Sequence, residues 1–430
     1  MFRLHKHRMD NGKTFFAIVD KNEFPGIERT LYISDKYPDS PPTTVETGLY
    51  DLIFFLTCME ICNISVEKEI ARKNIPNLSD IKLFVEAASM SQKDAFEYLH
   101  VKNGYKNNIK KLNLSDRAIS NALYKSKKRK LVRIKTKNDR IDAAISYIEF
   151  IYKFYIPYPG RKIDIDKKTI INELKDSRGR VNKATLRLGS IKGLELTELL
   201  SIAEKIAPFS PDNPFKSSKW RNSLLILLYI FSGLRRGAIA KLKYSDLDFT
   251  NYSDTIHVTR TPNDIEDPRQ NVPSQKTREH LSVVPSQLIK ELKNYYEYTR
   301  ARFPESHKHT FIFVTEKNNR KTKAGSPLSL GSHNYIFQCM TKKFEFYLSP
   351  HRLRHSYATI LEILAKKSGW TSSQVQKVHN EQHGWAINSE MHILYSRLQI
   401  IKEMHEANRQ YSENIFKSRN NFMNNTNESL

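Results

Sequence analysis

One predicted helix start in the C-terminal half constrains this chain more than any other feature. Ser349 is a favourable N-cap residue, and Pro350 suits the first helical position because the N–H that proline lacks would be unsatisfied there. Apolar residues then recur at spacings of four, three and four, as the buried face of a helix requires. This face consists of Leu353, Tyr357, Ile360 and Leu364. The sequence therefore predicts a helix that begins here and packs on a core.

The same helix start carries side chains that suit an anion. His351 and Arg354 lie three residues apart, so their side chains lie on one side of the first turn. The free N–H groups and the macrodipole of a helix N-terminus also favour negative charge. We expect a phosphate site here, and the plain alternative is a basic helix start on the protein surface.

The charge of the chain indicates what could carry that phosphate. Seventy Lys and Arg residues stand against 46 Asp and Glu, a formal net charge of +24. Such an excess attracts polyanions, of which nucleic acid is the commonest. A basic run in the N-terminal half would suit a DNA backbone, or else form a solvated charged surface. Its members are Lys125, Lys127, Lys128, Arg129, Lys130 and Arg133.

Periodicity predicts a mainly α-helical chain with a small β-sheet, an α+β fold. Residues 1–45 indicate a small N-terminal extension in which the segment Thr30–Ile33 looks β-like. Residues 46–185 have helical periodicity and end in a linker rich in Pro and Gly. Residues 190–412 form a second domain whose helices are interrupted by two β-like segments, Thr255–Thr259 and His280–Val284, and residues 413–430 read as a flexible tail.

Cysteine content and hydropathy bear on where the protein works. The three cysteines are too few for a disulfide framework and form no CxxC pair. The longest apolar run, Leu224 to Phe231, has eight residues, too few to cross a bilayer. We therefore expect a soluble, cytoplasmic protein with no membrane partner.

Three segments, in this order along the chain, resemble the tyrosine recombinase (phage integrase) family. Ser232–Arg235 matches the segment that carries the first arginine of that family. His351–Thr359 matches the segment that carries the His-x-x-Arg motif of that family almost residue for residue, and it is the most specific element. Gly384–Trp385, followed by Tyr395, matches the last segment. The resemblance covers roughly 193–412, and the helical part before it is similar in composition to the core-binding domain of the family.

The resemblance implies a site-specific DNA recombinase or integrase that cleaves and rejoins DNA through a 3′-phosphotyrosine. Tyr395 would be the nucleophile, and two arginines would neutralise charge on the phosphate. A lysine would protonate the departing 5′-oxygen, and a histidine would act as general acid and base. The implied catalytic residues are Arg235, Lys276, His351, Arg354, Trp385 and Tyr395. This chemistry requires no cofactor and no metal.

The chain departs from the family pattern at three places. Ala238 stands where the family usually has an acidic residue. Trp385 precedes the tyrosine by one residue more than usual, so His383 is the alternative for its role. A long loop precedes Lys276, which makes this lysine the least specific of the matches.

The resemblance also implies partners and leaves alternatives. It implies double-stranded DNA, a homotetramer on paired DNA sites, integration or excision of a mobile element, and room for an accessory DNA-bending or directionality protein. A catalytically silent DNA-binding protein on the same scaffold and a type IB topoisomerase-like activity stay open. A metal-dependent hydrolase using His379 and His383 is disfavoured because no third ligand is evident.

Overall fold

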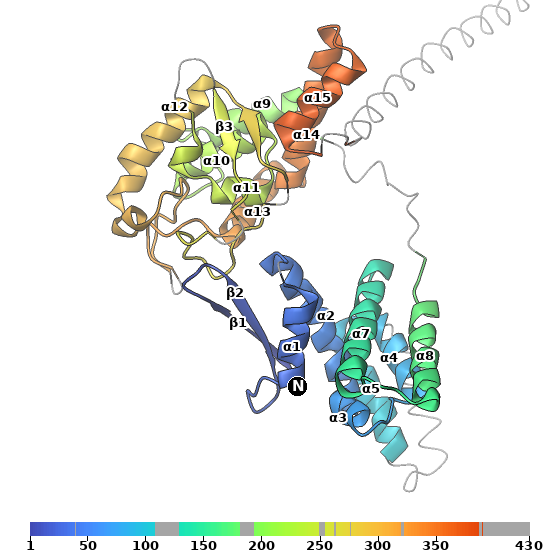
Figure 1. The fold of residues 1–430 in the computed structure, drawn as a ribbon. Coiled ribbons are helices and arrows are strands. Elements are labelled where there is room, and N and C mark those ends of the chain that lie inside the picture. Colours follow the sequence, from blue (N-terminus) through green and yellow to red (C-terminus); the bar gives the residue numbers. More distant parts are fainter. Residues whose placement is uncertain are drawn as a thin grey trace, which may run out of the picture. The chain divides into compact units, whose positions relative to one another are not determined.

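The computed structural model describes residues 1–38, 40–107, 129–180, 193–248, 254–261, 264–275, 277–319, 322–386 and 389. The chain divides into two compact units, Met1–Ala184 and Thr185–Leu430 (Figure 1). The predicted boundary between residues 185 and 190 lies close to this division. Each unit has its own hydrophobic core, so each is described separately.

The first unit begins with a β-hairpin and a helix. Strand β1 (Arg3–Arg8) pairs with β2 (Thr14–Val19) in antiparallel register, with Arg3 opposite Val19. Helix α1 (Ile27–Lys36) contains Thr30–Ile33, so the prediction of a β-like segment there is wrong. The residues of α1 that are buried are Arg29, Tyr32 and Ile33, at the spacing of a helix face. A four-residue stretch was too short to reveal this longer period.

The remaining helices of the first unit share one core with that hairpin. They are α2 (Pro42–Ile61), α3 (Val66–Ala71), α4 (Leu78–Ala88), α5 (Gln92–Asn107), α7 (Ile134–Tyr155) and α8 (Arg161–Asp176). The core cluster includes Phe16 and Ile18 of β2 as well as Tyr32 of α1. Residues 1–45, predicted as a small N-terminal extension, therefore contribute side chains to the core of the helical unit.

The second unit surrounds a two-stranded sheet with helices (Figure 1). Strand β3 (Thr255–Val258) pairs antiparallel with β4 (His280–Val283), and both lie where the sequence predicted β-like segments. The helices are α9 (Leu196–Ile206), α10 (Lys219–Ser232), α11 (Arg236–Lys241), α12 (Ser286–Asn294), α13 (Leu330–Phe344), α14 (Pro350–Lys367) and α15 (Ser372–His383). Shorter 3₁₀ and π turns occupy Tyr244–Asp246 and Tyr295–Lys308.

Helix α10 lies at the centre of this unit and packs on α14, α9 and α12. Its side chains Leu224, Leu225 and Leu228 are completely buried. The helix ends at Gly233, whose φ of 60° is the left-handed conformation that commonly terminates a helix.

Helix α14 begins as the sequence predicted but buries a different face along its second half. The Ser349 side chain accepts a hydrogen bond from the Arg352 N–H, which confirms the N-cap, and Leu353 is fully buried. Leu364, however, is 55% exposed, so the predicted apolar face is wrong at its far end. Tertiary packing buries Glu362 and Ala365 there instead, and apolar periodicity could not indicate a buried carboxylate.

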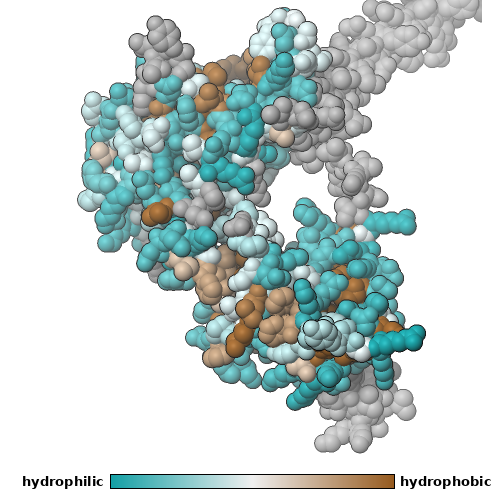
Figure 2. Space-filling model, in the orientation of Figure 1, coloured by the Kyte–Doolittle hydropathy of each residue, from teal (hydrophilic) through white to brown (hydrophobic). Residues whose placement is uncertain are grey.

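The visible surface of the molecule is mostly hydrophilic, and apolar side chains form separate patches on the face shown in Figure 2. Among the described residues, no helix is both long and apolar enough to cross a membrane.

A buried histidine makes the stability of the second unit depend on pH. His333 of α13 is completely buried, and its Nδ1 lies 2.9 Å from the hydroxyl oxygen of Tyr229. Burial, and to a lesser degree nearby Arg269 and Arg236, lowers the pKa of His333 from 6.5 to about 3. The folded protein therefore resists a protonation that the unfolded chain accepts.

We predict that His333 destabilises the second unit in acid. Its contribution to stability is intact above about pH 6.5 and is lost as the pH falls toward 3. At about pH 5 the expected loss is on the order of 2 kcal/mol. Urea unfolding near pH 5 and pH 7.5 measures it, because the three tryptophans, Trp220, Trp370 and Trp385, all belong to this unit.

In the variant His333→Gln, the loss of stability between these two pH values should be smaller than in the wild type. His257→Gln is the control because His257 is exposed, and this variant should keep the full loss. An equal loss in the wild type and in His333→Gln would contradict the prediction.

Candidate active site

The candidate site in the second unit is built around the buried guanidinium of Arg354. This side chain leaves the first turn of α14 and is 4% exposed. Its Nη1 donates to the carbonyl oxygen of Gly233 at 2.7 Å, and its Nη2 donates to that of His383 at 3.2 Å. These oxygens lie at the C-terminal ends of α10 and α15, where the helix dipole is negative. Two helix ends therefore hold a desolvated cation.

A glycine makes the approach of these elements possible. A Cβ at Gly233 would lie 2.7 Å from Cδ1 of Tyr357 and 2.8 Å from Cε1 of His383. Both distances are shorter than van der Waals contact, and the positive φ disfavours a side chain in any case. Two residues later, half-buried Arg235 occupies the N-cap of α11.

Arg354 donates to the Gly233 carbonyl oxygen, two residues before Arg235, and the charges of both arginines act on His351. His351 lies on the first turn of α14, and its pKa is lowered by partial burial of the ring, by the charge of Arg354 and by the charge of Arg235. The sequence predicted that His351 and Arg354 share one side of this turn. The electrostatic effect of both arginines on one imidazole supports that arrangement.

A second histidine, His355, is hydrogen-bonded to one ring nitrogen of His351. His355 Nε2 lies 2.9 Å from His351 Nε2, a distance at which the two nitrogens share one proton. Burial lowers the pKa of His355 to about 4, so this ring is neutral at pH 7. The bond occupies Nε2 of His351, which leaves Nδ1 to meet a substrate. His355 belongs to the segment that the sequence analysis matched, and its spacing of four residues from His351 on a predicted helix was the signal that could have indicated their contact.

His383 and Trp385, the alternatives for one position, lie in the same cluster. Their ring centroids are 4.8 Å apart, and both residues are buried. The guanidinium carbon of Arg354 lies 5.7 Å from the ring centroid of Trp385, within cation–π range. Burial and the charge of Arg354 hold the pKa of His383 far below its usual value, so His383 is neutral. The structure therefore places both residues beside Arg354.

The metal-site alternative fits the contacts of His379 poorly. His379 lies on α15, and its Nε2 is 3.5 Å from Oε2 of the buried carboxylate of Glu362. Its ring also stacks on Trp385, with centroids 5.9 Å apart and planes inclined by 8°. In the part of the chain that the structure describes, no group of three or more His, Cys, Asp or Glu side chains is arranged to hold a metal ion.

The remaining predicted site residues belong to the first unit or fall outside the described part of the chain. Arg129, Lys130 and Arg133 belong to the first unit, where the guanidinium carbon of Arg129 lies 5.0 Å from the Tyr98 ring centroid and Arg133 is the N-cap of α7. Five predicted residues lie outside the described part of the chain: Lys125, Lys127, Lys128, Lys276 and Tyr395. Both neighbours of Lys276 are described, and Gln275 and Thr277 are buried and hydrogen-bonded to each other.

Sequence reasoning missed two residues that join the elements of the site. Arg278 donates to the carbonyl oxygen of Trp385, and Gln382 bonds both β4 and the end of α10. The closeness of Arg278 to Lys276 in the sequence was the only available signal. The partners of both residues lie roughly 100 or more positions away, where local patterns carry no information.

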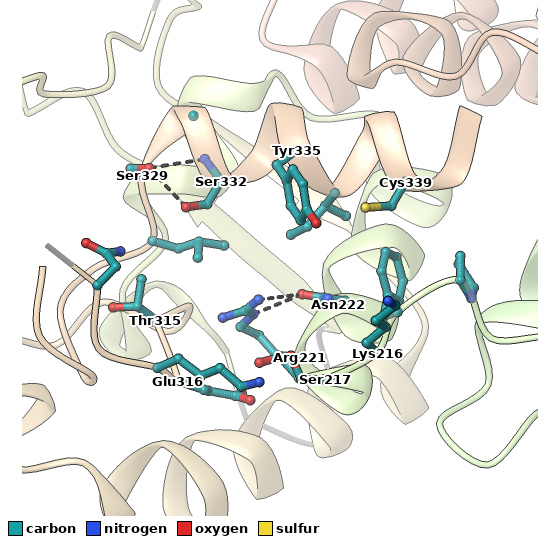
Figure 3. A pocket seen from close by; sticks show the side chains of 18 of the residues that line it. Lys216, Ser217, Arg221, Asn222, Thr315, Glu316, Ser329, Ser332, Tyr335 and Cys339 are labelled. Atoms are coloured by element: carbon teal, nitrogen blue, oxygen red, sulfur yellow. Dashed lines mark hydrogen bonds between the residues drawn. The ribbon is translucent and has the colours of Figure 1, made fainter. Parts of the chain in front are cut away.

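A cavity of about 570 Å³ lies at the other end of α10 (Figure 3). Its wall includes Lys216, Arg221, Glu316 and Tyr335, and the Arg221 guanidinium donates to the side-chain oxygen of Asn222. Because α10 has 14 residues and rises about 1.5 Å per residue, about 21 Å of helix separates its two ends. The cavity is therefore separate from the Arg354 cluster.

We predict that Gly233→Ala destabilises the second unit more than Gly369→Ala. Both glycines have positive φ, 60° and 73°, but a Cβ at Gly369 meets nothing within 4 Å. Gly369→Ala therefore measures the backbone strain alone, about 1 kcal/mol. The clash with Tyr357 and His383 should add roughly 1–3 kcal/mol at Gly233. Urea unfolding followed by tryptophan fluorescence gives both values, and equal losses would contradict the geometry described above.

Comparison with known proteins adds family membership. The model of the phage integrase family matches residues 190–419, more than half of the chain. No curated protein matches the chain. The crystal structure of a XerA recombinase is 14% identical, covering 88% of this chain and 98% of the other, with a TM-score of 0.34. A XerH site-specific recombinase bound to a palindromic difH substrate is 19% identical, covering 76% of this chain and 83% of the other, with a TM-score of 0.44. The Tn1549 transposon integrase in complex with circular intermediate DNA is 15% identical, covering 73% of this chain and 94% of the other, with a TM-score of 0.36.

The family match rests on the sequence segment that contains the Arg354 cluster. The mainly helical fold with small two-stranded sheets agrees with the fold class predicted from the sequence. This chain belongs to the phage integrase family, the family of the tyrosine site-specific recombinases.

Proposed function

We propose that this chain cleaves and rejoins double-stranded DNA at a defined site through a 3′-phosphotyrosine formed by Tyr395, in the integration or excision of a mobile element. One observation carries the proposal. Buried Arg354 and His351 lie three residues apart at the start of α14, Arg354 is bonded to the backbone two residues before Arg235, and the charges of both arginines act on the histidine. This arrangement suits a phosphodiester.

The arginines answer a chemical difficulty. A phenol has a pKa near 10, so only about one tyrosine in a thousand is ionised at neutral pH. Positioned arginines stabilise the charge that develops on the phosphate oxygens, and they supply roughly 10³–10⁵ in rate at such centres. Because Arg354 is already held by two backbone carbonyls, it need not reorganise during the reaction.

The remaining groups complete the proton transfers. In this proposal the Tyr395 oxygen attacks phosphorus, and the bond from phosphorus to the 5′-oxygen breaks. His351, neutral at pH 7, takes the phenol proton, and Lys276 gives a proton to the departing oxygen. Trp385 or His383 packs against the phosphate. A 5′-hydroxyl of a second strand then reverses the reaction, and because the ester conserves the bond energy, ATP is not required.

DNA binding is proposed from the charge of the chain. The net charge of +24 favours a polyanion, and the run from Lys125 to Arg133 is proposed to contact the DNA backbone. Strand exchange between two duplexes needs two pairs of active sites. We therefore propose a homotetramer on paired sites, with an accessory DNA-bending or directionality protein as a further partner.

We predict that Tyr395→Phe abolishes covalent protein–DNA adducts on a nicked suicide substrate, because phenylalanine has no nucleophilic oxygen. The adduct is measured as a shifted band on a denaturing gel. Tyr411→Phe is the matched control, since it removes another tyrosine hydroxyl of the C-terminal segment, and it should keep the adduct. A gel shift under native conditions tests whether both variants still bind DNA.

Other outcomes of this assay support other functions. An adduct in Tyr395→Phe would show that another residue is the nucleophile. DNA binding by the wild type without any adduct would indicate a catalytically silent protein, as the buried Ala238 in place of an acidic residue would allow. Cleavage scattered along supercoiled DNA would indicate a topoisomerase-like activity.

We also predict the pH dependence of cleavage. His351 accepts a proton only when it is neutral, and its pKa is lowered from 6.5. The single-turnover rate of adduct formation should therefore rise with pH through a midpoint below about 6.5 and be level above it. A midpoint above pH 7 would contradict the proposed role of His351.

A further inference from the structure

Two polar side chains join β4, the end of α15 and the end of α10. One is Gln382 on the last turn of α15, and the other is Arg278, two residues before β4. We call these two residues the clasp. Neither is one of the groups proposed to contact the phosphate or carry out the proton transfers.

The carboxamide of Gln382 bonds in two directions. Its Oε1 accepts from the Val283 N–H at 2.9 Å, and its Nε2 lies 3.1 Å from the Val283 carbonyl oxygen and 2.9 Å from Oγ of Ser282. The same Nε2 lies 3.3 Å from the carbonyl oxygen of Ser232, the last residue of α10. Since Gln382 is only 6% exposed, these bonds replace the water that its amide has lost.

Arg278 reaches the same turn from the strand side. Its Nε donates to the carbonyl oxygen of Trp385 at 2.8 Å, and its Nη2 donates to that of Asn380 at 3.3 Å. Its Nη2 also pairs with the carboxylate of Glu381. That carboxylate in turn accepts from the N–H of Leu281 on β4 at 3.4 Å. The planar guanidinium thus fixes the turn in more than one direction, as a lysine could not.

The hairpin needs such support because it has only two strands. An isolated two-stranded hairpin is marginally stable in water. β3 pairs with one edge of β4, and the side chains of Glu381 and Gln382 bond backbone groups of β4. The clasp therefore sets where the hairpin lies relative to α15 and α10.

The atoms fixed by the clasp adjoin those that hold Arg354. Ser232 precedes Gly233, and Gln382 precedes His383, and the carbonyl oxygens of Gly233 and His383 are the two that accept from Arg354. Arg278 binds the backbone of Trp385, beside Arg354, and follows Lys276 by two residues. The clasp thus connects the segments of Arg235, Lys276 and Trp385.

We propose that Arg278 and Gln382 are positioning residues for DNA cleavage, acting by holding β4 and the segment before it, whose sequence contains Lys276, against the end of α15. This inference rests on the proposed function. A purely structural role is the alternative, and the chemistry of the leaving group separates the two. With the natural substrate, the bond from phosphorus to the 5′-oxygen breaks and that oxygen must gain a proton.

Sulfur in place of this bridging oxygen removes the need for the proton. The bond from Tyr395 to phosphorus forms, the bond from phosphorus to sulfur breaks, and sulfur leaves as a thiolate, because a thiol has a pKa of only about 8.5. A defect in placing Lys276 should therefore disappear on the sulfur substrate. A defect in the arginines or in the fold should persist.

The test compares Gln382→Leu and Arg278→Lys in the full chain on nicked oxygen and sulfur substrates. The first keeps the approximate volume and removes the amide, and the second keeps the charge and removes the fork. On the oxygen substrate we expect single-turnover cleavage to fall about 10- to 100-fold in each, with DNA binding unchanged. On the sulfur substrate we expect rates within about threefold of the wild type.

Matched controls fix the interpretation. Lys343→Gln breaks an ion pair with Asp212 whose side chains are 37% and 59% exposed, close to the 36% and 53% of Arg278 and Glu381, and it should leave both rates unchanged. Lys276→Ala should be slow on oxygen and rescued on sulfur. Urea unfolding of each variant shows whether it folds. If Gln382→Leu does not fold, the test uses Arg278→Lys, because the Arg278 side chain is 36% exposed.

Each result decides between the possibilities. Wild-type rates on oxygen in both variants, or equal losses on both substrates while Lys276→Ala is rescued, would overturn the inference. If Lys276→Ala is not rescued, the role proposed for Lys276 is wrong. The clasp is then judged on the oxygen substrate, where slow cleavage with unchanged DNA binding and unfolding supports it and normal cleavage refutes it.

Discussion

The second unit depends on how it satisfies one buried cation. Removing the guanidinium of Arg354 from water is costly unless its N–H groups find acceptors. The carbonyl oxygens of Gly233 and His383 accept from it, which requires α10 and α15 to end at the same place. Both helices end in a left-handed glycine, Gly233 at 60° and Gly384 at 61°. A Cβ at Gly384 would lie 2.3 Å from Nδ1 of His280, so this second helix end is as crowded as the first.

The charge around Arg354 follows from the same burial. His280, His355 and His383 lie nearby, and burial lowers the pKa of each below its usual value. These rings are therefore neutral at pH 7, and the positive charge is left to the arginines. Arg235 and Arg354 both act on His351. A phosphodiester that enters this site would therefore meet the positive charge that the proposed chemistry needs. A helix N-terminus adds to that attraction.

Local chemistry explains which features the sequence could predict. The start of α14 depends on Ser349 and Pro350, and the end of α10 depends on Gly233, so adjacent residues decide both. The α1 helix was missed because the four-residue stretch that looked β-like spans little more than one turn of a helix, too few residues to show a repeat. The burial of Glu362 beside His379 and the bonds of Gln382 join distant residues, and no local pattern encodes them. The prediction that Arg235, His351 and Arg354 form one site rests on motif order, which stands in for that missing distance information.

The site and the stability of the second unit share the same bonds. Its groups come from α10, α11, α14, α15 and the β4 hairpin, so assembling them means closing loops of roughly 100 residues or more. The hydrogen bonds of Arg354, Arg278 and Gln382 form only when those loops have closed. Substitutions at these residues should then act on cleavage and on unfolding together, unless the change is small enough to shift a side chain without opening a loop. Conservative variants are for this reason more informative than alanine at the clasp, since they move the catalytic groups while leaving the unit folded.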